Sequence, residues 1–337
     1  MGVVGAFALA RLLRPTLVVG GSKSLALGLF RAGTRAGAQH RTVADVQRIE
    51  AGVSGGLRVA CRDGREFTAR AVVSTLDPKT TFLELVGNAA VPNAIRQAAE
   101  AWRLDPTGPF TAHFGIKGEP PEVATEEASR ALVQVIGFEN AAAVGEHLDD
   151  VTGGRLPASP AGHLTVTTRH DPTQAAPGPY GPLHTLRFQT MAPYEHPHGA
   201  WDRQRIEYRS RCWELATRHT SGLDQARLLF AFADSPHDIQ RRFRTTRRGS
   251  MRQGALVRSQ TFANRPHPDC STTRTPIEGL YLAGGGVHPG VPGSLAGGYN
   301  AAGAVCSDLG IERWWPEPPM VQRAREAGLL PEPLPAP

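Results

Sequence analysis

Lysine and cysteine are scarce in this chain of 337 residues, and each shortage excludes a class of protein. Only Lys23, Lys79 and Lys117 are lysine among the 37 basic residues. Since the net charge is only +6 and no basic stripe alternates with aromatic residues, no nucleic-acid binding is expected. The four cysteines form no C-x-x-C pair, so their spacing indicates neither a zinc site nor a dithiol redox centre. So few thiols favour a reducing location, and we expect the cytoplasm.

Apolar runs long enough to cross a bilayer are also lacking. The first ten residues are apolar, but Arg11 and Arg14 follow them, which is the wrong order for a secretory signal. We expect a buried helix over residues 2–13, with a membrane-contacting helix as the alternative. An arginine cluster further along, by default a solvated surface, is compatible with peripheral membrane contact or an acidic substrate. It comprises Arg241, Arg242, Arg244, Arg247, Arg248 and Arg252.

Glycine and proline, in contrast, are plentiful, with 37 and 28 residues. They predict many turns and short elements rather than a helical bundle. Hydrophobic residues make up 40% of the chain, which is enough for a core and excludes wholesale disorder.

Two stretches carry the structural signal. In the first, residues 17–19 lead into Gly20-Gly21-Ser22 and a helix over residues 25–36. A meander follows, with strands expected over residues 43–49, 57–61 and 66–73. In the second, a buried strand over residues 279–283 meets Gly284-Gly285-Gly286, and a helix opens at Ser294 as N-cap and runs to about residue 309. Three glycines after a strand let backbone N–H groups approach an anionic or polyol ligand; the alternative is a plain tight turn.

The middle of the chain carries less chemistry. Strands are expected over residues 110–116 and 163–168, and helices over residues 201–218 and 234–243. The histidines are dispersed, and His196 and His198 lie in a Pro/Gly-rich stretch, so no metal site is expected.

Both stretches resemble a known family. The segment Ala71-Val72-Val73-Ser74-Thr75-Leu76-Asp77-Pro78 resembles the middle of phytoene desaturase-like FAD-dependent oxidoreductases, in the branch of pyridine nucleotide-disulphide oxidoreductase domain-containing protein 2. The segment Thr275-Pro276-Ile277-Glu278-Gly279-Leu280-Tyr281-Leu282-Ala283-Gly284-Gly285-Gly286-Val287-His288-Pro289-Gly290 resembles their carboxy-terminal flavin motif. The resemblance implies an α/β (α+β) fold: a ββα flavin domain, incomplete at its N-terminus, with an inserted antiparallel-sheet substrate domain.

The resemblance also implies where FAD would bind. Val46 would meet the adenine through its backbone, Gly284, Gly285 and Gly286 would lie near the pyrophosphate and ribityl chain, and the stretch from Pro289 would lie near the isoalloxazine ring. The cofactor-binding residues expected are therefore Val46, Gly284, Gly285, Gly286, Pro289, Gly290, Gly293, Ser294 and Leu295. No catalytic side chain is identified. The expected domains are residues 1–80 and 256–312 for the flavin domain, 81–255 for the substrate domain, and a Pro-rich tail over 313–337.

One family feature is absent from the sequence: no G-x-G-x-x-G turn occurs anywhere in it. We expect a truncated gene, a second chain that supplies this half, or a relic. The favoured function is that of an FAD-dependent oxidoreductase of desaturase, dehydrogenase or isomerase type. It would transfer hydride from an apolar substrate, with isoprenoids as one candidate class, to flavin N5. The alternative is a non-catalytic binding or escort module on the same fold, or an inactive fragment.

Overall fold

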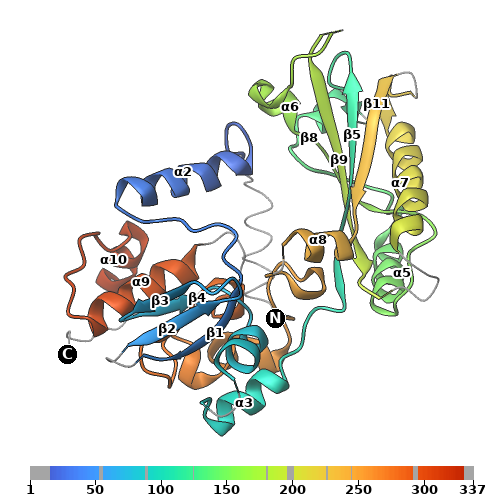
Figure 1. The fold of residues 1–337 in the computed structure, drawn as a ribbon. Coiled ribbons are helices and arrows are strands. Elements are labelled where there is room, and N and C mark those ends of the chain that lie inside the picture. Colours follow the sequence, from blue (N-terminus) through green and yellow to red (C-terminus); the bar gives the residue numbers. More distant parts are fainter. Residues whose placement is uncertain are drawn as a thin grey trace. The chain divides into compact units, whose positions relative to one another are not determined.

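A computed structural model describes residues 16–52, 56–87, 90–123, 125–179, 181–195, 201–224, 227–243, 245–290 and 295–329 (Figure 1). The expected helix over residues 2–13 lies outside these ranges, as do His196, His198, Gly293 and Ser294. Residue contacts divide the chain into two compact units. The sheet unit comprises Met1–Thr42 and Pro106–Phe243, and the glycine-turn unit comprises Val43–Asp105 and Arg244–Pro337. These boundaries fall at other residues than those of the expected domains.

The glycine-turn unit is built on two small sheets. Strands β1 (Val46–Ala51), β2 (Leu57–Cys61) and β3 (Glu66–Ala69) form the expected antiparallel meander. The single strand expected over residues 66–73 is wrong: the chain breaks after Ala69, and β4 (Val72–Ser74) pairs in parallel with β12 (Leu280–Leu282). The partner of β4 lies some two hundred residues further along the chain, so the local pattern could not show the change of sheet.

Helices complete this unit. They are the π-helix η1 (Lys79–Val86), α3 (Asn93–Glu100), α9 (Ala296–Asp308), α10 (Pro319–Glu326), and the 3₁₀ turns η4 (Arg247–Gly249), η5 (Arg258–Gln260), η6 (Phe262–Asn264), η7 (Pro268–Cys270) and η8 (Gly284–Gly286). Apolar side chains from the meander, η1, α3 and β12 form one core, including Ile49, Leu57, Phe82, Ile95, Leu280 and Leu282. The carboxylate of Asp308 near the end of α9 accepts hydrogen bonds from Tyr281 on β12 (2.9 Å) and from Arg274, whose Nη2 lies 2.8 Å from it. These bonds fix α9 against the parallel pair.

The sheet unit is a five-stranded antiparallel sheet in the order β11 (Leu228–Asp234), β5 (Thr107–Lys117), β9 (Leu183–Pro193), β8 (Gly162–Val166), β7 (Gln134–Ile136). Helix α7 (Trp201–Arg218) begins and ends where the sequence predicts and packs along one face (Figure 1). Alternate residues of β5 and β9, such as Phe110, Phe114 and Phe188, are fully buried under it. The sheet therefore has one covered face, and side chains at the odd-numbered positions of these two strands point to the other.

Smaller elements surround this sheet. They are the pair β6 (Glu122–Val123) and β10 (Thr220–Ser221), the helices α2 (Ser22–Arg35), α4 (Glu126–Ser129), α5 (Ala141–Thr152), α6 (Thr167–His170) and α8 (Pro236–Arg242), and the 3₁₀ turn η2 (Pro172–Gln174). Helix α2 confirms the helix expected after the first glycine pair, and the amide of Gly20 just before it donates to the Asp171 carboxylate at 2.7 Å. Among the described residues no helix is both long and apolar enough to span a membrane. The mixed α/β fold class is confirmed.

Candidate functional site

The glycine turn follows strand β12 directly, as the sequence predicts. Gly284 has φ +83°, a backbone conformation in which glycine is favoured. A Cβ on Gly284 would lie 2.9 Å from Oε1 of Gln253 and 3.0 Å from the carbonyl oxygen of Thr75, and one on Gly285 would lie 2.6 Å from the carbonyl oxygen of Arg252. The protein's own backbone therefore already requires glycine at both positions.

Gln253 takes up two of the turn's amides. Its Oε1 accepts from the N–H groups of Gly285 (2.8 Å) and Gly286 (3.1 Å), and its Nε2 donates to the carbonyl of Thr75 (2.7 Å). The indole of Trp102 in turn donates to the Gln253 carbonyl at 2.9 Å. The amides of Gly285 and Gly286 are thus bonded within the protein, so these two groups hold the turn in place rather than project toward a ligand.

Arg265 is the second support of the turn. This side chain has no exposed surface and donates to five backbone carbonyls. Two of its bonds go to Gly285, at 2.9 Å from Nε and 2.7 Å from Nη2. The guanidinium also lies 5.1 Å from the ring centroid of Trp102. Burial lowers the pKa of Arg265 to about 10, so it remains charged at neutral pH. A Cβ on Gly290 would come within 2.3 Å of its Nε.

A carboxylate anchors the segment that carries these groups. Asp105 accepts from the hydroxyl of Ser250 at 2.7 Å and from Nη2 of Arg252 at 3.0 Å. The Ser250 hydroxyl also accepts from the amide of Gly254 at 3.2 Å. Residues before and after Gln253 are therefore fixed, and the turn is held by a connected set of bonds.

The start of helix α9 lies against the glycine turn and remains open on one side. Leu295 occupies the N-cap position with φ +58°. A Cβ on Gly297 would lie 2.9 Å from the amide nitrogen of Gly284, whereas a Cβ on Gly298 would meet no atom within 4 Å. Among the described residues, no atom fills the space beside Gly298 in the first turn of this 13-residue helix, where the helix dipole has its positive end. This space is where a ligand could approach the unit.

The other expected cofactor-binding residues are placed as follows. Val46 is the first residue of β1, half-buried against the core and paired with Cys61. Gly284 is exposed, Gly285 and Pro289 are half-buried, and Gly286 and Gly290 are buried. The structure therefore brings the residues from Gly284 to Gly290 and Leu295 to one end of β12 and α9, while Val46 lies on the neighbouring meander.

The residues that the sequence did not reveal are Gln253, Trp102 and Asp105, together with the supporting role of Arg265. Gln253 and Gly285 are 32 positions apart in the chain, and no local pattern marks a glutamine as an acceptor for distant amides. Arg265 belongs to a segment, Arg265-Pro266, that precedes the glycine motif, and its buried position is the feature that gives it a role.

Thiols and histidines form no further centre in the described part of the chain. Cys61, Cys212 and Cys270 are buried, Cys306 is partly exposed, and all four are unbridged. Burial raises the pKa of Cys270 to about 12, which makes this thiol inert. Among the described residues, no group of three or more His, Cys, Asp or Glu is arranged to hold a metal ion.

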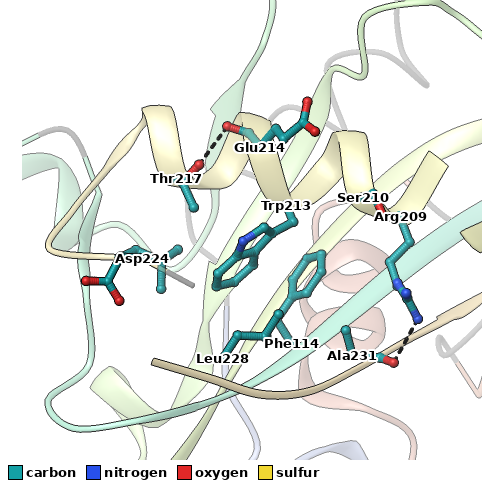
Figure 2. A pocket seen from close by; sticks show the side chains of 10 residues that line it. Phe114, Arg209, Ser210, Trp213, Glu214, Thr217, Asp224, Leu228 and Ala231 are labelled. Carbon is teal, nitrogen blue, oxygen red and sulfur yellow. Dashed lines mark hydrogen bonds between the residues drawn. The ribbon is translucent and has the colours of Figure 1, made fainter. Parts of the chain in front are cut away.

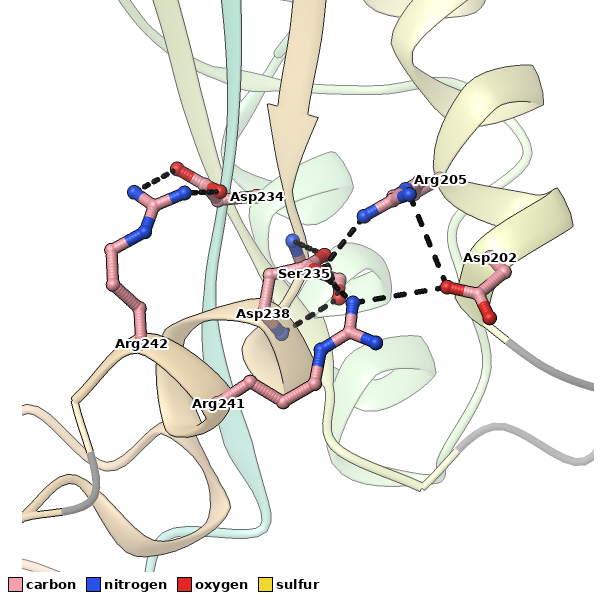
Figure 3. Close-up of polar contacts among 7 residues, drawn as sticks. All are labelled: Asp202, Arg205, Asp234, Ser235, Asp238, Arg241 and Arg242. Carbon is pink, nitrogen blue, oxygen red and sulfur yellow. Dashed lines mark hydrogen bonds and ion pairs between the residues drawn. The ribbon is translucent and has the colours of Figure 1, made fainter.

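The arginine cluster is largely neutralised by acidic partners. In the sheet unit, Arg242 makes two bonds to Asp234, at 2.7 and 3.0 Å, and Arg241 pairs with Asp238 (Figure 3). In the glycine-turn unit, Arg247 pairs with Glu84 at 2.5 Å and Arg252 with Asp105. Four of the six arginines are thus paired with acidic side chains, and peripheral membrane contact stays a prediction.

A pocket of about 610 Å³ lies on the covered side of the sheet, between α7 and β11 (Figure 2). The rings of Phe114 and Trp213 form its apolar wall, with centroids 5.0 Å apart. Arg209 spans its other side and donates to the carbonyl of Ala231 at 2.9 Å. Glu214 and Asp224 also line it. It shares no residue with the glycine turn, and no expected site residue lines it.

Comparison with known proteins finds relatives whose names are those of oxidoreductases. No protein-family model matches it. It is 32% identical over 332 residues to one of the subunits of limonene dehydrogenase from Castellaniella defragrans, and the match covers 95% of this chain and 60% of that protein. It is 29% identical to mouse pyridine nucleotide-disulfide oxidoreductase domain-containing protein 2 over 87% of this chain and 51% of that protein. It is 26% identical to the lycopene-forming phytoene desaturase of Pseudescherichia vulneris, over 86% of this chain and 56% of that protein.

Solved structures resemble the chain only distantly. An oxidoreductase from Methanosarcina mazei matches with a TM-score of 0.49 and 13% identity, over 85% of this chain and 54% of that one. A putrescine oxidase matches with a TM-score of 0.46 and 10% identity, over 86% and 53%. These scores are too low for any conclusion about cofactor or function. The sequence comparisons confirm the expected resemblance: the chain is similar to a limonene dehydrogenase subunit, to pyridine nucleotide-disulfide oxidoreductase domain-containing protein 2 and to a phytoene desaturase, and it spans between 51 and 60% of their length.

Proposed function

We propose that this chain is one part of an FAD-dependent oxidoreductase and that its glycine turn, with the first turn of α9, holds one side of the flavin. The observation that carries the proposal is the similarity to a component of limonene dehydrogenase along 95% of the chain. The turn supports it, because two buried side chains, Gln253 and Arg265, are devoted to fixing the backbone there.

The residues at this place fit such a ligand. The backbone of Gly284 is exposed, and a Cβ on Gly298 would meet only open space, so a large flat molecule has access to the end of α9. The positive end of this helix favours negative charge on a bound group. Bound FAD would supply the hydride acceptor. The exposed backbone of Gly284 would lie against its pyrophosphate and ribityl side, in a turn that Gly285 and Gly286 keep in place through Gln253. Pro289, Gly290, Gly293, Ser294 and Leu295 would lie on its ring side, and Val46 near its adenine.

The chain's own side chains act by positioning. Gln253 and Arg265 bond the amides and carbonyl of the turn, so the protein itself fixes the turn's conformation. A pre-formed turn loses little entropy on binding. With the hydride going to flavin N5, the proton lost from the neighbouring carbon on forming the double bond would pass to water, and no side-chain acid or base is assigned.

The substrate we propose is an apolar small molecule. Limonene and phytoene, which appear in the names of two relatives, are hydrocarbons. In the sheet unit, the face opposite α7 exposes Phe230, Phe232 and Met191, with 48%, 45% and 37% of their surface accessible. Such exposed apolar side chains on one side of a sheet are suited to an apolar ligand.

We also propose that a second polypeptide completes the flavin site. The relative with the highest of the three identities is named as one component of a larger enzyme, and the present sequence contains no G-x-G-x-x-G turn. Such a turn binds the pyrophosphate of a dinucleotide at a helix N-terminus. A chain without it would bind FAD weakly by itself. The alternative, a non-catalytic binding module, is favoured by the same absence.

Purification of the full chain from its own cells under mild conditions tests this function. We expect flavin absorbance in the sample, together with a co-purified polypeptide that contains G-x-G-x-x-G. Addition of a monoterpene hydrocarbon without oxygen should bleach that absorbance. A flavin-containing complex that no apolar substrate bleaches would favour the binding module, and a colourless sample without such a polypeptide would contradict the proposal.

A further inference from the structure

The open face of the sheet carries an ordered set of polar side chains around one arginine. In the strand register, Phe232 on β11 is opposite His113 on β5, His113 is opposite Arg187 on β9, and Arg187 is opposite Thr165 on β8. The four therefore form one row across the sheet, on the face that α7 does not cover. The neighbouring row runs from Asp234 through Thr111 and Gln189 to His163.

Arg187 is the half-buried cation at the centre of this face. Among the residues that the structure describes, none offers it a carboxylate: its guanidinium is bonded to the amide oxygen of Gln189. Burial lowers its pKa, and no acidic group opposes that effect. This contrasts with Arg242 nearby, which is fully paired with Asp234. A half-buried guanidinium without a counter-ion is costly, and an anionic ligand would remove that cost.

The histidines next to Arg187 carry no negative charge, and the nearby Asp234 is already paired with Arg242. The pKa of His113 is lowered by burial and by Arg187, and the pKa of His163 is lowered by the same two causes, so both imidazoles are neutral at neutral pH. Neutral imidazoles, Gln189 and Thr165 are hydrogen-bonding groups that suit an oxyanion beside a guanidinium.

Next to this polar centre the face is apolar. The ring of Phe232 stacks on His113 with centroids 4.5 Å apart, and Phe230 lies 6.5 Å further along β11 with nearly parallel planes. Gly115, opposite Phe230, leaves the space into which that ring folds: a Cβ there would lie 2.0 Å from it. Arg187 on β9 and the two rings on β11 thus lie on the same face of the sheet, with His113 of β5 between them, so that a ligand with a charged head and an apolar tail would reach across β5.

We propose that this face binds an apolar molecule that ends in a carboxylate, with the carboxylate on Arg187 and the hydrocarbon along Phe232 and Phe230. The inference deepens the proposed function, on which it rests for the claim that such a molecule is the substrate or product. It adds to the proposed apolar substrates a class with a charged end, which would supply the counter-ion that Arg187 lacks among the described residues.

Geranic acid and geraniol are suitable probes, since they share one hydrocarbon skeleton and differ in the charged head. Ligand-observed NMR titration of the full chain, without any cofactor, measures the affinity of the chain for each probe. We expect saturable binding of geranic acid and an affinity for geraniol that is lower by about tenfold. Arg187→Gln should lower the affinity for geranic acid by about tenfold and leave the affinity for geraniol unchanged. Arg203→Gln removes the same charge from an exposed side chain of helix α7 and should change neither affinity.

Phe232→Ala provides a second test that does not depend on the folding of the arginine variant. It should lower the affinities for geranic acid and geraniol by the same factor. Equal binding of acid and alcohol, or an acid affinity unaffected by Arg187→Gln, would overturn the proposal. Displacement of the acid by equimolar inorganic phosphate would assign Arg187 to a phosphate group instead and also overturn it. Because no flavin is present, failure here leaves the flavin site untouched, and a failed flavin site leaves this result standing.

Discussion

At the scale of single residues, the glycine turn depends on side chains that come from distant parts of the chain. Gln253 has φ +58°, in the left-handed region that an ordinary residue adopts only when its surroundings impose it. Its amide then reaches both Gly285 and Gly286. The sequence shows three consecutive glycines and so predicts a turn, but it does not show what satisfies their amides, because that depends on a contact across 32 positions.

Replacement of Gln253 by Ala should destabilise the protein without changing the strain at this position, since Ala has the same Cβ. Two amides of the turn would lose their acceptor, one of them buried. We expect the free energy of unfolding to fall by about 2 to 4 kcal/mol. Urea unfolding measures it, with Gln322→Ala, on the exposed surface of α10, as the control that should change by less than about 0.5 kcal/mol. Equal stability of the two variants would show that the turn does not need Gln253.

At the scale of elements, helices were more predictable than strands. The pattern of residues 201–218 predicts α7 to the residue, because a periodic apolar face is a local signal. The helix expected over residues 234–243 is α8, shorter because Asp234 ends strand β11 and Ser235 forms the N-cap. The strand expected over residues 66–73 failed because β4 is paired with β12, a choice that depends on the tertiary fold.

Helix α8 should make the sheet unit sensitive to acid. Burial raises the pKa of Asp238, but bonds from Ser235, Arg241 and Arg205 outweigh it and hold the pKa at about 2, below its ordinary value of 3.8 (Figure 3). A lowered folded-state pKa gives stability that is present above the ordinary value and is lost as pH falls toward about 2.

Asp238→Asn should therefore lower the free energy of unfolding by about 1 to 2 kcal/mol at neutral pH. The difference in free energy of unfolding between this variant and the wild type should become smaller as the pH approaches about 2. Asp202→Asn is the matched control, because Asp202 is exposed and lies 3.8 Å from the same Arg241. Denaturant titrations at neutral and acidic pH measure both. A constant difference between Asp238→Asn and wild type at every pH would contradict the assignment.

At the scale of the whole molecule, the α/β class and the resemblance to phytoene desaturase-like oxidoreductases could be predicted from the sequence, since the segment around Gly284 carries a specific motif. The division into units could not. Contacts assign helix α2 to the sheet unit, although it precedes the meander of the other unit, and they assign α3 to the glycine-turn unit. The face around Arg187 was equally hidden, because its members come from four strands that only the register brings together.

The central claim is that the open side of the α9 N-terminus faces a flavin. Gly298 and Gly303 lie on the same helix, and a Cβ at either would meet no atom within 4 Å, so Gln at either position should preserve or improve helix stability. We would titrate the full chain and both variants with FAD and follow flavin fluorescence. We predict weak but saturable binding to the wild type and to Gly303→Gln, and an affinity lower by about tenfold, or about 1.4 kcal/mol, for Gly298→Gln. No saturable binding to the wild type, or equal binding by the two variants, would contradict the claim.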